Sequence, residues 1–225
     1  HIVVTHLDFD HAGGLEDFPH ATVHVNLREK EAADHGDGRG QEPVVRADQD
    51  RRPVADLDGV PEVAETAVTF EGNSWLKAEA VASATGLPAL ADDSGLCVDV
   101  LGGSPGIFSA RWAGTDLDGT ERDRANVRLL LAQLGDVPDE HRAARFRCAA
   151  VLALPDGRSA VAEGHVTGTV VREPAGDNGF GYDPIFRPDG DQRTLAQHSD
   201  EEKNAISHRG AAFRAMVPHL RELLG

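Results

Sequence analysis

The chain has 225 residues, of which 40% are hydrophobic and 27% charged, and its 38 acidic and 22 basic side chains give a formal net charge of -16 at pH 7. This length and composition suit a globular protein without disulfide or metal cross-links, and the acidic charge argues against nucleic acid or a membrane surface as a partner. No apolar run is long enough to span a membrane and no signal-peptide pattern opens the chain, so the sequence predicts a cytoplasmic protein.

The chain changes character near residue 57, and we expect a boundary there between an atypical segment, residues 1–56, and one densely patterned domain, residues 57–225. Ile2–Thr5 is apolar enough for a strand. Residues 26–56 are rich in Asp, Arg and Gly and contain few large apolar side chains. This composition is typical of a charged linker.

The run THLDFDHAGG at 5–14 places the ligand-type side chains of His6, Asp10 and His11 close together after an apolar strand. With this run, residues 1–25 resemble a fragment of the metallo-β-lactamase fold, whose metal-binding loop usually has a second His where Asp8 stands here. That fold needs further His and Asp ligands downstream, and the rest of the chain does not supply them. The segment therefore indicates a remnant or a join between two reading frames, and a zinc-dependent hydrolase fragment is kept as an alternative function.

The domain expected at residues 57–225 begins with a helix and an acidic turn. Asn73 is a favourable N-cap for a helix through 74–81 that ends at Gly86. The run ADDSG at 91–95 then precedes a short apolar strand at 96–100. The adjacent carboxylates at this strand edge can hold a hard cation, or they can bond to their own backbone as in an ordinary Asp-rich turn.

The second half of the chain predicts a helix, a hairpin and two closing helical segments. The helix starts at Thr120 and is expected to be scaffold, with an apolar stripe of Val127, Leu130, Leu131 and Leu134. Strands at 145–154 and 159–166 flank an Asp-Gly turn, which predicts an antiparallel hairpin and hence a mixed sheet. Segments 201–208 and 211–224 are helical, with Pro218 kinking or breaking the last one. Cys97 and Cys148 are expected to be buried free thiols.

Two late motifs have ligand-binding chemistry. In DNGFGYDPIF at 177–186, the glycines permit close backbone approach and Phe180 can stack on a planar base, although such a turn can also simply close a core. In EEKNAISHR at 201–209, Lys203, Ser207 and Arg209 lie within two helical turns and can present several donors to one site, although a charged helix is often only a solvated face.

In their order along the chain, these motifs resemble the inosine triphosphate pyrophosphatase family, also called XTP/dITP pyrophosphatases. The resemblance covers residues 57–225. The motifs that carry it are TFEGN at 69–73 with Lys77-Ala78, ADDSG at 91–95, GSPGIFSARWAG at 103–114, ARFRC at 144–148, GFGYDPIF at 179–186 and EKNAISHR at 202–209. So many ordered motifs are very improbable by coincidence.

The resemblance implies a two-lobed α/β fold around a long mixed β-sheet flanked by helices, usually as a homodimer. It implies hydrolysis of ITP, dITP and XTP to the monophosphate and pyrophosphate with Mg2+ as cofactor, which cleanses the nucleotide pool. Asp93 is implied as the catalytic acid that activates water and, together with Glu65, as a metal ligand. The implied substrate-binding residues are Lys77 for phosphate and Ser94 beside the substrate. Phe180, Gly181, Tyr182 and Asp183 are implied to form the base-binding wall, and Lys203, His208 and Arg209 to read the purine.

The resemblance also implies discrimination against ATP. At the N-terminus, however, this chain departs from the family pattern. Donors aimed at a 6-keto oxygen, from Arg209 above all, leave a 6-amino group facing an unpaired donor, so ATP should be rejected. Family members carry a Thr or Ser, an Asn and a Lys in a phosphate-gripping loop after the first strand, whereas here Leu7, Asp8 and Asp10 stand around those places. Acids there repel polyphosphate, so weakened activity is predicted, and a catalytically impaired nucleotide-binding remnant is kept as an alternative.

Overall fold

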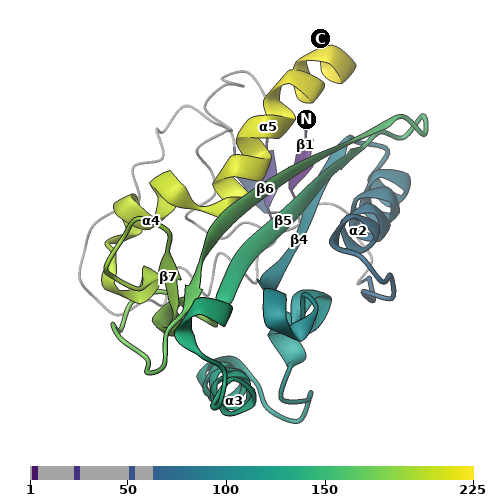
Figure 1. Cartoon of the computed structure of the whole chain (residues 1–225). Helices are drawn as coiled ribbons and strands as arrows, with labels where there is room; N and C mark the ends of the chain where they lie inside the picture. Colours follow the sequence, from purple (N-terminus) through teal and green to yellow (C-terminus); the bar gives the residue numbers. More distant parts are fainter. Residues whose placement is uncertain (1, 5–22, 26–50, 54–62) are drawn as a thin grey trace. The chain divides into compact units, whose positions relative to one another are not determined.

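The computed structural model describes residues 2–4, 23–25, 51–53 and 63–225. Figure 1 shows their arrangement. The helices and strands of these residues are, in chain order, β1 (Ile2–Val4), β2 (Val23–Val25), β3 (Arg51–Pro53), α2 (Phe70–Thr85), β4 (Ala89–Val98), α3 (Gly119–Gln133), β5 (Ala143–Ala153), β6 (Ser159–Val170), β7 (Phe186–Pro188), α4 (Asp200–Ile206) and α5 (His208–Leu224).

The described strands form one mixed sheet in the order β3-β2-β1-β4-β5-β6-β7. The pairs β1–β2, β1–β4 and β2–β3 are parallel, and β6–β7 is antiparallel. The turn between β5 and β6 is closed by the Leu154 N–H, which donates to the Arg158 carbonyl at 2.9 Å, and by the Gly157 N–H, which donates to the Leu154 carbonyl at 3.0 Å. The predicted mixed sheet, the hairpin and the first strand are confirmed.

The chain divides into two compact units. Unit 1 comprises residues 1–93, 149–164 and 209–225, and unit 2 comprises residues 94–148 and 165–208. The boundary expected after residue 56 stays a prediction, and β1, β2 and β3 precede it. The loop at 5–14 that resembles a metallo-β-lactamase motif lies outside the described residues, as does the charged stretch 26–50.

Helix α2 of unit 1 begins earlier than predicted. Thr69 is its N-cap, because its backbone is extended and its hydroxyl accepts the Gly72 N–H at 3.0 Å. Asn73 is therefore an interior, fully buried residue and the prediction that it caps the helix is wrong. Gly86 ends the helix as predicted, in the left-handed conformation with φ 67°.

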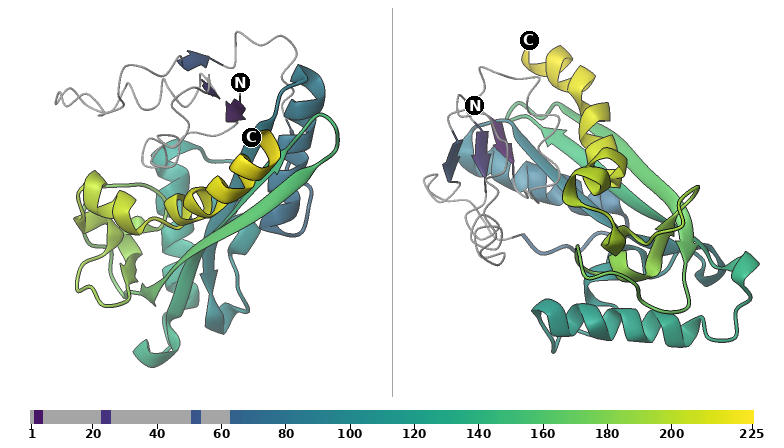
Figure 2. Two further views of the ribbon diagram at one scale, coloured as in Figure 1. Left: turned by 90° about the horizontal axis from the view of Figure 1, so that it is seen from above. Right: turned by 90° about the vertical axis from the view of Figure 1, so that its left-hand side faces the viewer.

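Unit 1 has a core of small side chains between α2 and the sheet. The buried members of this core are Ala78, Val81, Ala82, Ala89, Ala91, Val151 and Ala153. Figure 2 shows α2 and α5 on opposite faces of these strands. Helix α5 continues through Pro218 without breaking, and its buried side chains include Phe213, Met216 and Leu220.

Asp92 and Asp93 lie inside strand β4 and not in a turn. Nine of its ten residues are buried and Ser94 is partly exposed, in the burial pattern BBBBBiBBBB. The strand ends at Val98, and Asp99–Leu101 form a short 3-10 helix instead of the expected strand end. The local sequence misleads because Asp disfavours strands, and here the pairing of β4 with its neighbours overrides that preference.

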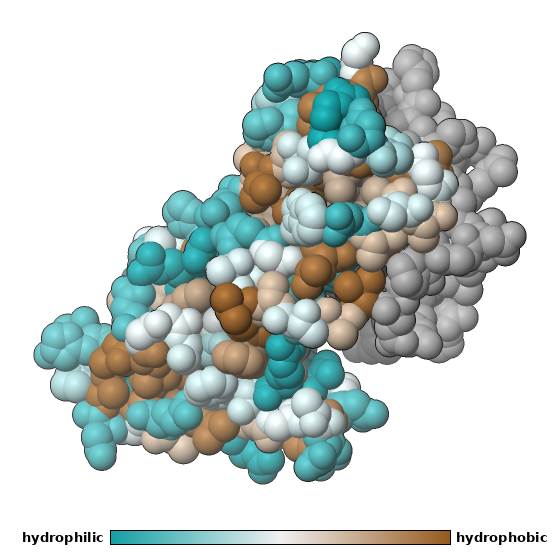
Figure 3. Space-filling view, turned by 90° about the vertical axis from the view of Figure 1, so that its right-hand side faces the viewer, coloured by the Kyte–Doolittle hydropathy of each residue, from teal (hydrophilic) through white to brown (hydrophobic). Residues whose placement is uncertain are grey.

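Unit 2 has the larger apolar cluster, and helix α3 covers it. Val127, Leu130 and Leu134 are buried in this cluster and Leu131 is packed against it, which confirms the predicted stripe. Cys97 and Cys148 are buried thiols that form no disulfide within the described residues, as predicted. On the face shown in Figure 3, the apolar side chains lie in separate patches among hydrophilic ones. In the part of the chain that the structure describes, every helix is too short or too polar to cross a membrane.

Candidate functional site

Helix α2 presents two polar side chains on its buried face, one turn apart. Asn73 and Lys77 are four residues apart, so they share that face, and their exposed fractions are 0% and 6%. Asn73 Nδ2 donates to Asp93 Oδ2 at 2.9 Å, and Lys77 Nζ forms an ion pair with Glu65 Oε1 at 2.8 Å. Neighbouring positions of one helix therefore hold the two acids that the sequence analysis selected as metal ligands.

The orientation of the Asn73 amide is fixed by a second hydrogen bond. Its Oδ1 accepts the Ala67 N–H at 2.9 Å, so the NH2 group must face Asp93. Asp93 is buried with 9% exposure, and its Oδ2 accepts this hydrogen bond. Sequence reasoning missed Asn73 as a site residue because it assigned this side chain to capping. The TFEGN motif around it was the available signal.

Asp92 faces away from Asp93, because successive strand residues point to opposite sides of the sheet. Its Oδ2 forms an ion pair with Arg209 Nε at 2.9 Å, and the two side chains are 3% and 17% exposed. Burial lowers the pKa of Arg209 to about 10, which leaves the guanidinium charged at neutral pH. Within unit 1, Arg209 is thus held by an acid that the sequence analysis did not assign.

In unit 2, Phe180 stands on a loop that is tied to helix α4. Its ring is 54% exposed, and Lys203 Nζ lies 4.6 Å from the ring centroid. Lys203 is itself buried and forms an ion pair with Asp183 Oδ2 at 2.9 Å. The same carboxylate oxygen accepts the Phe180 N–H at 3.0 Å. The three residues form one connected group that presents an aromatic face backed by a cation.

Tyr182 and Gly181 lie on the same loop but have different surroundings. Tyr182 is 4% exposed and belongs to the apolar cluster of unit 2, and its hydroxyl donates to the Ser109 carbonyl at 2.9 Å. Burial raises the pKa of Tyr182 well above its usual range. Gly181 has φ 57° and its N–H donates to Asp123 Oδ2 at 3.1 Å. Of the predicted base wall, Phe180 is thus exposed and Tyr182 forms part of the core.

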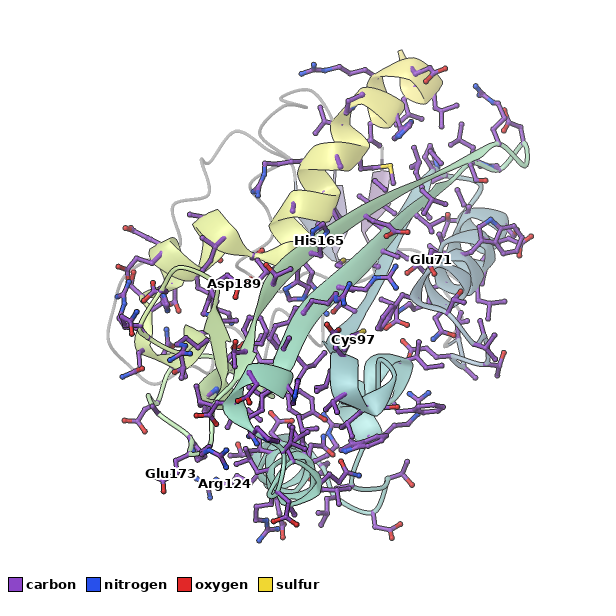
Figure 4. The ribbon with its side chains drawn as sticks, viewed as in Figure 1. Glu71, Cys97, Arg124, His165, Glu173 and Asp189 are labelled. Atoms are coloured by element: carbon purple, nitrogen blue, oxygen red, sulfur yellow. The ribbon has the colours of Figure 1, made fainter. Side chains whose placement is uncertain are left out.

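Ser207 and His208 lie at the junction of helices α4 and α5, and Ser94 lies inside strand β4. Helix α4 ends at Ile206, with Ser207 as its extended C-cap, so the expected single helix through 201–208 is wrong. The His208 ring stacks on Phe146 with centroids 4.9 Å apart and planes 15° from parallel. Ser94 follows Asp93 directly in β4. Figure 4 draws the side chains of the described residues and labels Arg124 of helix α3.

The acids of the described residues do not form a complete metal cage. No group of three or more His, Cys, Asp or Glu side chains in that part of the chain is placed to hold an ion by itself. Mg2+ is commonly held by one or two carboxylates together with substrate phosphates and water. Glu65 and Asp93, each held by a partner on α2, therefore fit a cation that is shared with a polyphosphate.

Comparisons with known proteins place this geometry in context. The model of the Ham1 family matches residues 41–219. A dITP/XTP pyrophosphatase from Streptomyces coelicolor is 64% identical over 166 residues, which are 74% of this chain and 81% of that protein. A dITP/XTP pyrophosphatase from Bifidobacterium animalis subsp. lactis is 45% identical over 234 residues, 89% of this chain and 93% of that protein. The structure of a HAM1 protein from Coxiella burnetii superposes with a TM-score of 0.75 at 33% identity, covering 98% of each chain.

Proposed function

The chain belongs to the Ham1 family, and on this premise we propose that it hydrolyses the non-standard purine nucleoside triphosphates ITP, dITP and XTP to the monophosphate and pyrophosphate. The observation that carries the proposal is its close similarity to proteins named dITP/XTP pyrophosphatase. The protein is accordingly a hydrolase of phosphoric anhydrides, and its activity removes such nucleotides from the pool.

Asp93 is proposed as the general base. The oxygen of the attacking water bonds to the α-phosphorus, the bond from that phosphorus to the bridging oxygen breaks, pyrophosphate leaves and Asp93 takes the proton. The amide of Asn73, itself fixed by Ala67, holds the carboxylate in one orientation. A base must be held within hydrogen-bond reach of its water, and this anchoring supports the assignment.

Lys77 and a metal ion held in part by Glu65 are proposed to neutralise the charge of the triphosphate. Nucleotide pyrophosphatases need a divalent metal ion, and we propose Mg2+, held by Glu65 and Asp93. When bound, this ion neutralises phosphate charge and acidifies water. Lys77 is 6% exposed and pairs with Glu65, so its ammonium group is kept beside that acid. A local cation of this kind lets a protein with net charge -16 bind a polyanion.

The base is proposed to be recognised by Phe180, Lys203, His208 and Arg209. The exposed ring of Phe180 offers a stacking face, and Lys203 and Asp183 fix that ring from behind. Donors from His208 and Arg209 would pair with a 6-keto oxygen, and a 6-amino group would leave them unpaired at a cost of about 1–3 kcal/mol per buried group. A guanidinium has five N–H donors, so the pairing of Arg209 Nε with Asp92 is compatible with this second role.

The test is pyrophosphate release from ITP, XTP and ATP in the presence of Mg2+, with the chain compared with Asp93→Asn. We expect release from ITP and XTP, little from ATP, and a loss of at least about a hundredfold in the variant. Asp136→Asn is the matched control, because Asp136 is an exposed acid of unit 2. Comparable turnover of ATP would overturn the purine selectivity, and binding of ITP without release would favour the impaired remnant. We also propose that the chain forms a homodimer, as the family resemblance implies, and its mass in analytical ultracentrifugation tests this.

A further inference from the structure

Helix α3 carries an acid that reaches the loop bearing Phe180, 58 residues later in the chain. Asp123 Oδ2 accepts the Gly181 N–H at 3.1 Å, and both groups are partly buried. Gly181 has φ 57°, a left-handed conformation that glycine adopts without steric cost. The sequence analysis predicted a purely structural role for this helix. The hydrogen bond adds a contact with the loop that carries Phe180.

Helix α3 also supports the same loop through an indirect route. Tyr182 donates its hydroxyl to the carbonyl of Ser109, which lies in the 3-10 helix Gly106–Arg111. Asn126, one turn of α3 after Asp123, donates its amide to the same carbonyl at 3.2 Å and accepts the Ala113 N–H at 2.7 Å. Gly181 is therefore held directly by Asp123, and Tyr182 shares the Ser109 carbonyl with Asn126 of the same helix.

The direction of Phe180 depends on these contacts. Its own N–H is bound to Asp183, and the next N–H, of Gly181, is bound to Asp123. The peptide groups on both sides of an exposed ring are thus tied to carboxylates from different elements. Loss of one tie leaves a glycine-flanked residue free to turn, because Gly179 and Gly181 restrict the backbone little.

We infer that Asp123 is a positioning residue that fixes the Gly181 turn and so sets the affinity of the Phe180 face for a purine base. The inference rests on the proposed function for its kinetic consequence, because it assumes that Phe180 stacks on the substrate. The contribution of the Asp123 charge to the raised pKa of Tyr182 agrees with a close approach of the two side chains. Because the Asp123 carboxylate bonds to the loop that carries Phe180, its loss should affect binding of the base and not the chemical step.

The kinetic test compares Asp123→Ala, Asp123→Asn and Glu121→Ala. Asparagine keeps a side-chain oxygen that can accept the Gly181 N–H, whereas alanine does not. Glu121→Ala removes the same charge from an exposed position of the same helix. We expect Asp123→Ala to raise KM for ITP by about tenfold with kcat within twofold, and we expect Asp123→Asn and Glu121→Ala to resemble the parent.

A second readout tests the positioning separately from catalysis. Tyr182 is the only tyrosine in the chain, so 13C-labelled tyrosine reports on this loop alone in NMR spectra. Asp123→Ala should shift or broaden the Tyr182 signals, and Asp123→Asn should preserve them. An unchanged Tyr182 signal and an unchanged KM in Asp123→Ala would overturn the inference, as would equal defects in Asn and Ala. If the parent releases no pyrophosphate, the proposed function fails while the NMR comparison still decides the positioning role.

Discussion

The Asn73 side-chain amide donates a 2.9 Å hydrogen bond to Asp93 Oδ2, and both side chains are buried. Asn73 lies on α2 and Asp93 lies on β4, so the bond couples helix packing to the orientation of the proposed base. A buried amide with partners on both its oxygen and its nitrogen has one orientation. Asp93 is thus oriented by its neighbours before any substrate binds.

Replacement of Asn73 by alanine should lower kcat for ITP by about tenfold or more, because the carboxylate loses the donor that orients it. The change should also lower the free energy of unfolding by about 1–3 kcal/mol, because the Ala67 N–H loses its acceptor. Ser74→Ala is the matched control, since its hydroxyl bonds to the Phe70 and Ala149 carbonyls and not to the acids. A loss of kcat in Ser74→Ala as large as in Asn73→Ala would contradict the orienting role. Pyrophosphate release and urea unfolding measure the two quantities.

The Asp92–Arg209 ion pair should be important for stability. Asp92→Ala leaves a largely buried guanidinium without this acid, and the free energy of unfolding should fall by about 3 kcal/mol. The double variant Asp92→Ala, Arg209→Met should lose less than the sum of the two single variants, because the stranded charge is also removed. Urea unfolding of the four proteins completes a double-mutant cycle. Additive losses would show that the pair does not interact energetically.

The elements that could be predicted from the sequence are those fixed by neighbouring residues. The Asp156-Gly157 turn, the α3 stripe and the Gly86 end of α2 depend on local chemistry alone. Local sequence could not decide where α2 begins, because Thr69 and Asn73 are both favourable N-cap residues. Burial of Phe70, which is 5% exposed, extends the helix by a turn and makes Thr69 the cap.

The candidate site was predicted where its residues stand in motifs and was missed where they act at a distance. Asp93, Lys77 and Phe180 stand in recognisable motifs, and each has contacts that suit its proposed role. Asp123 is one acid among many on a polar helix face, and its partner Gly181 is 58 residues away. Such a contact follows from tertiary packing, which no local pattern encodes.

Low pH should destabilise the segment from Asp191 to His198. Asp191 accepts hydrogen bonds from the Arg193 N–H and pairs with His198 Nε2 at 2.9 Å, and these contacts hold the pKa of Asp191 well below its usual value. A carboxylate with a depressed folded pKa contributes stability above its unfolded pKa, near about 4, and loses it as pH falls toward the folded value. Asp191→Asn should therefore be less stable than the parent at pH 7, and the difference should shrink below about pH 4. Urea unfolding between pH 7 and pH 2 measures it, and a constant difference over that range would refute the assignment.

Chelation should abolish pyrophosphate release from ITP, and added Mg2+ should restore it, if Glu65 and Asp93 share a cation with the triphosphate. Glu65→Gln keeps the shape of the side chain but removes a charge, so the Mg2+ concentration for half-maximal rate should rise about tenfold. Glu79→Gln is the matched control, because Glu79 is an exposed acid on the same helix as Lys77. The ion pair of Lys77 with Glu65 at 2.8 Å also predicts a higher KM for ITP in Glu65→Gln, since the ammonium group loses its anchor. Mg2+ titrations at saturating ITP separate the two effects. An unchanged Mg2+ requirement in Glu65→Gln would assign Glu65 to the placement of Lys77 alone and leave the metal to other ligands.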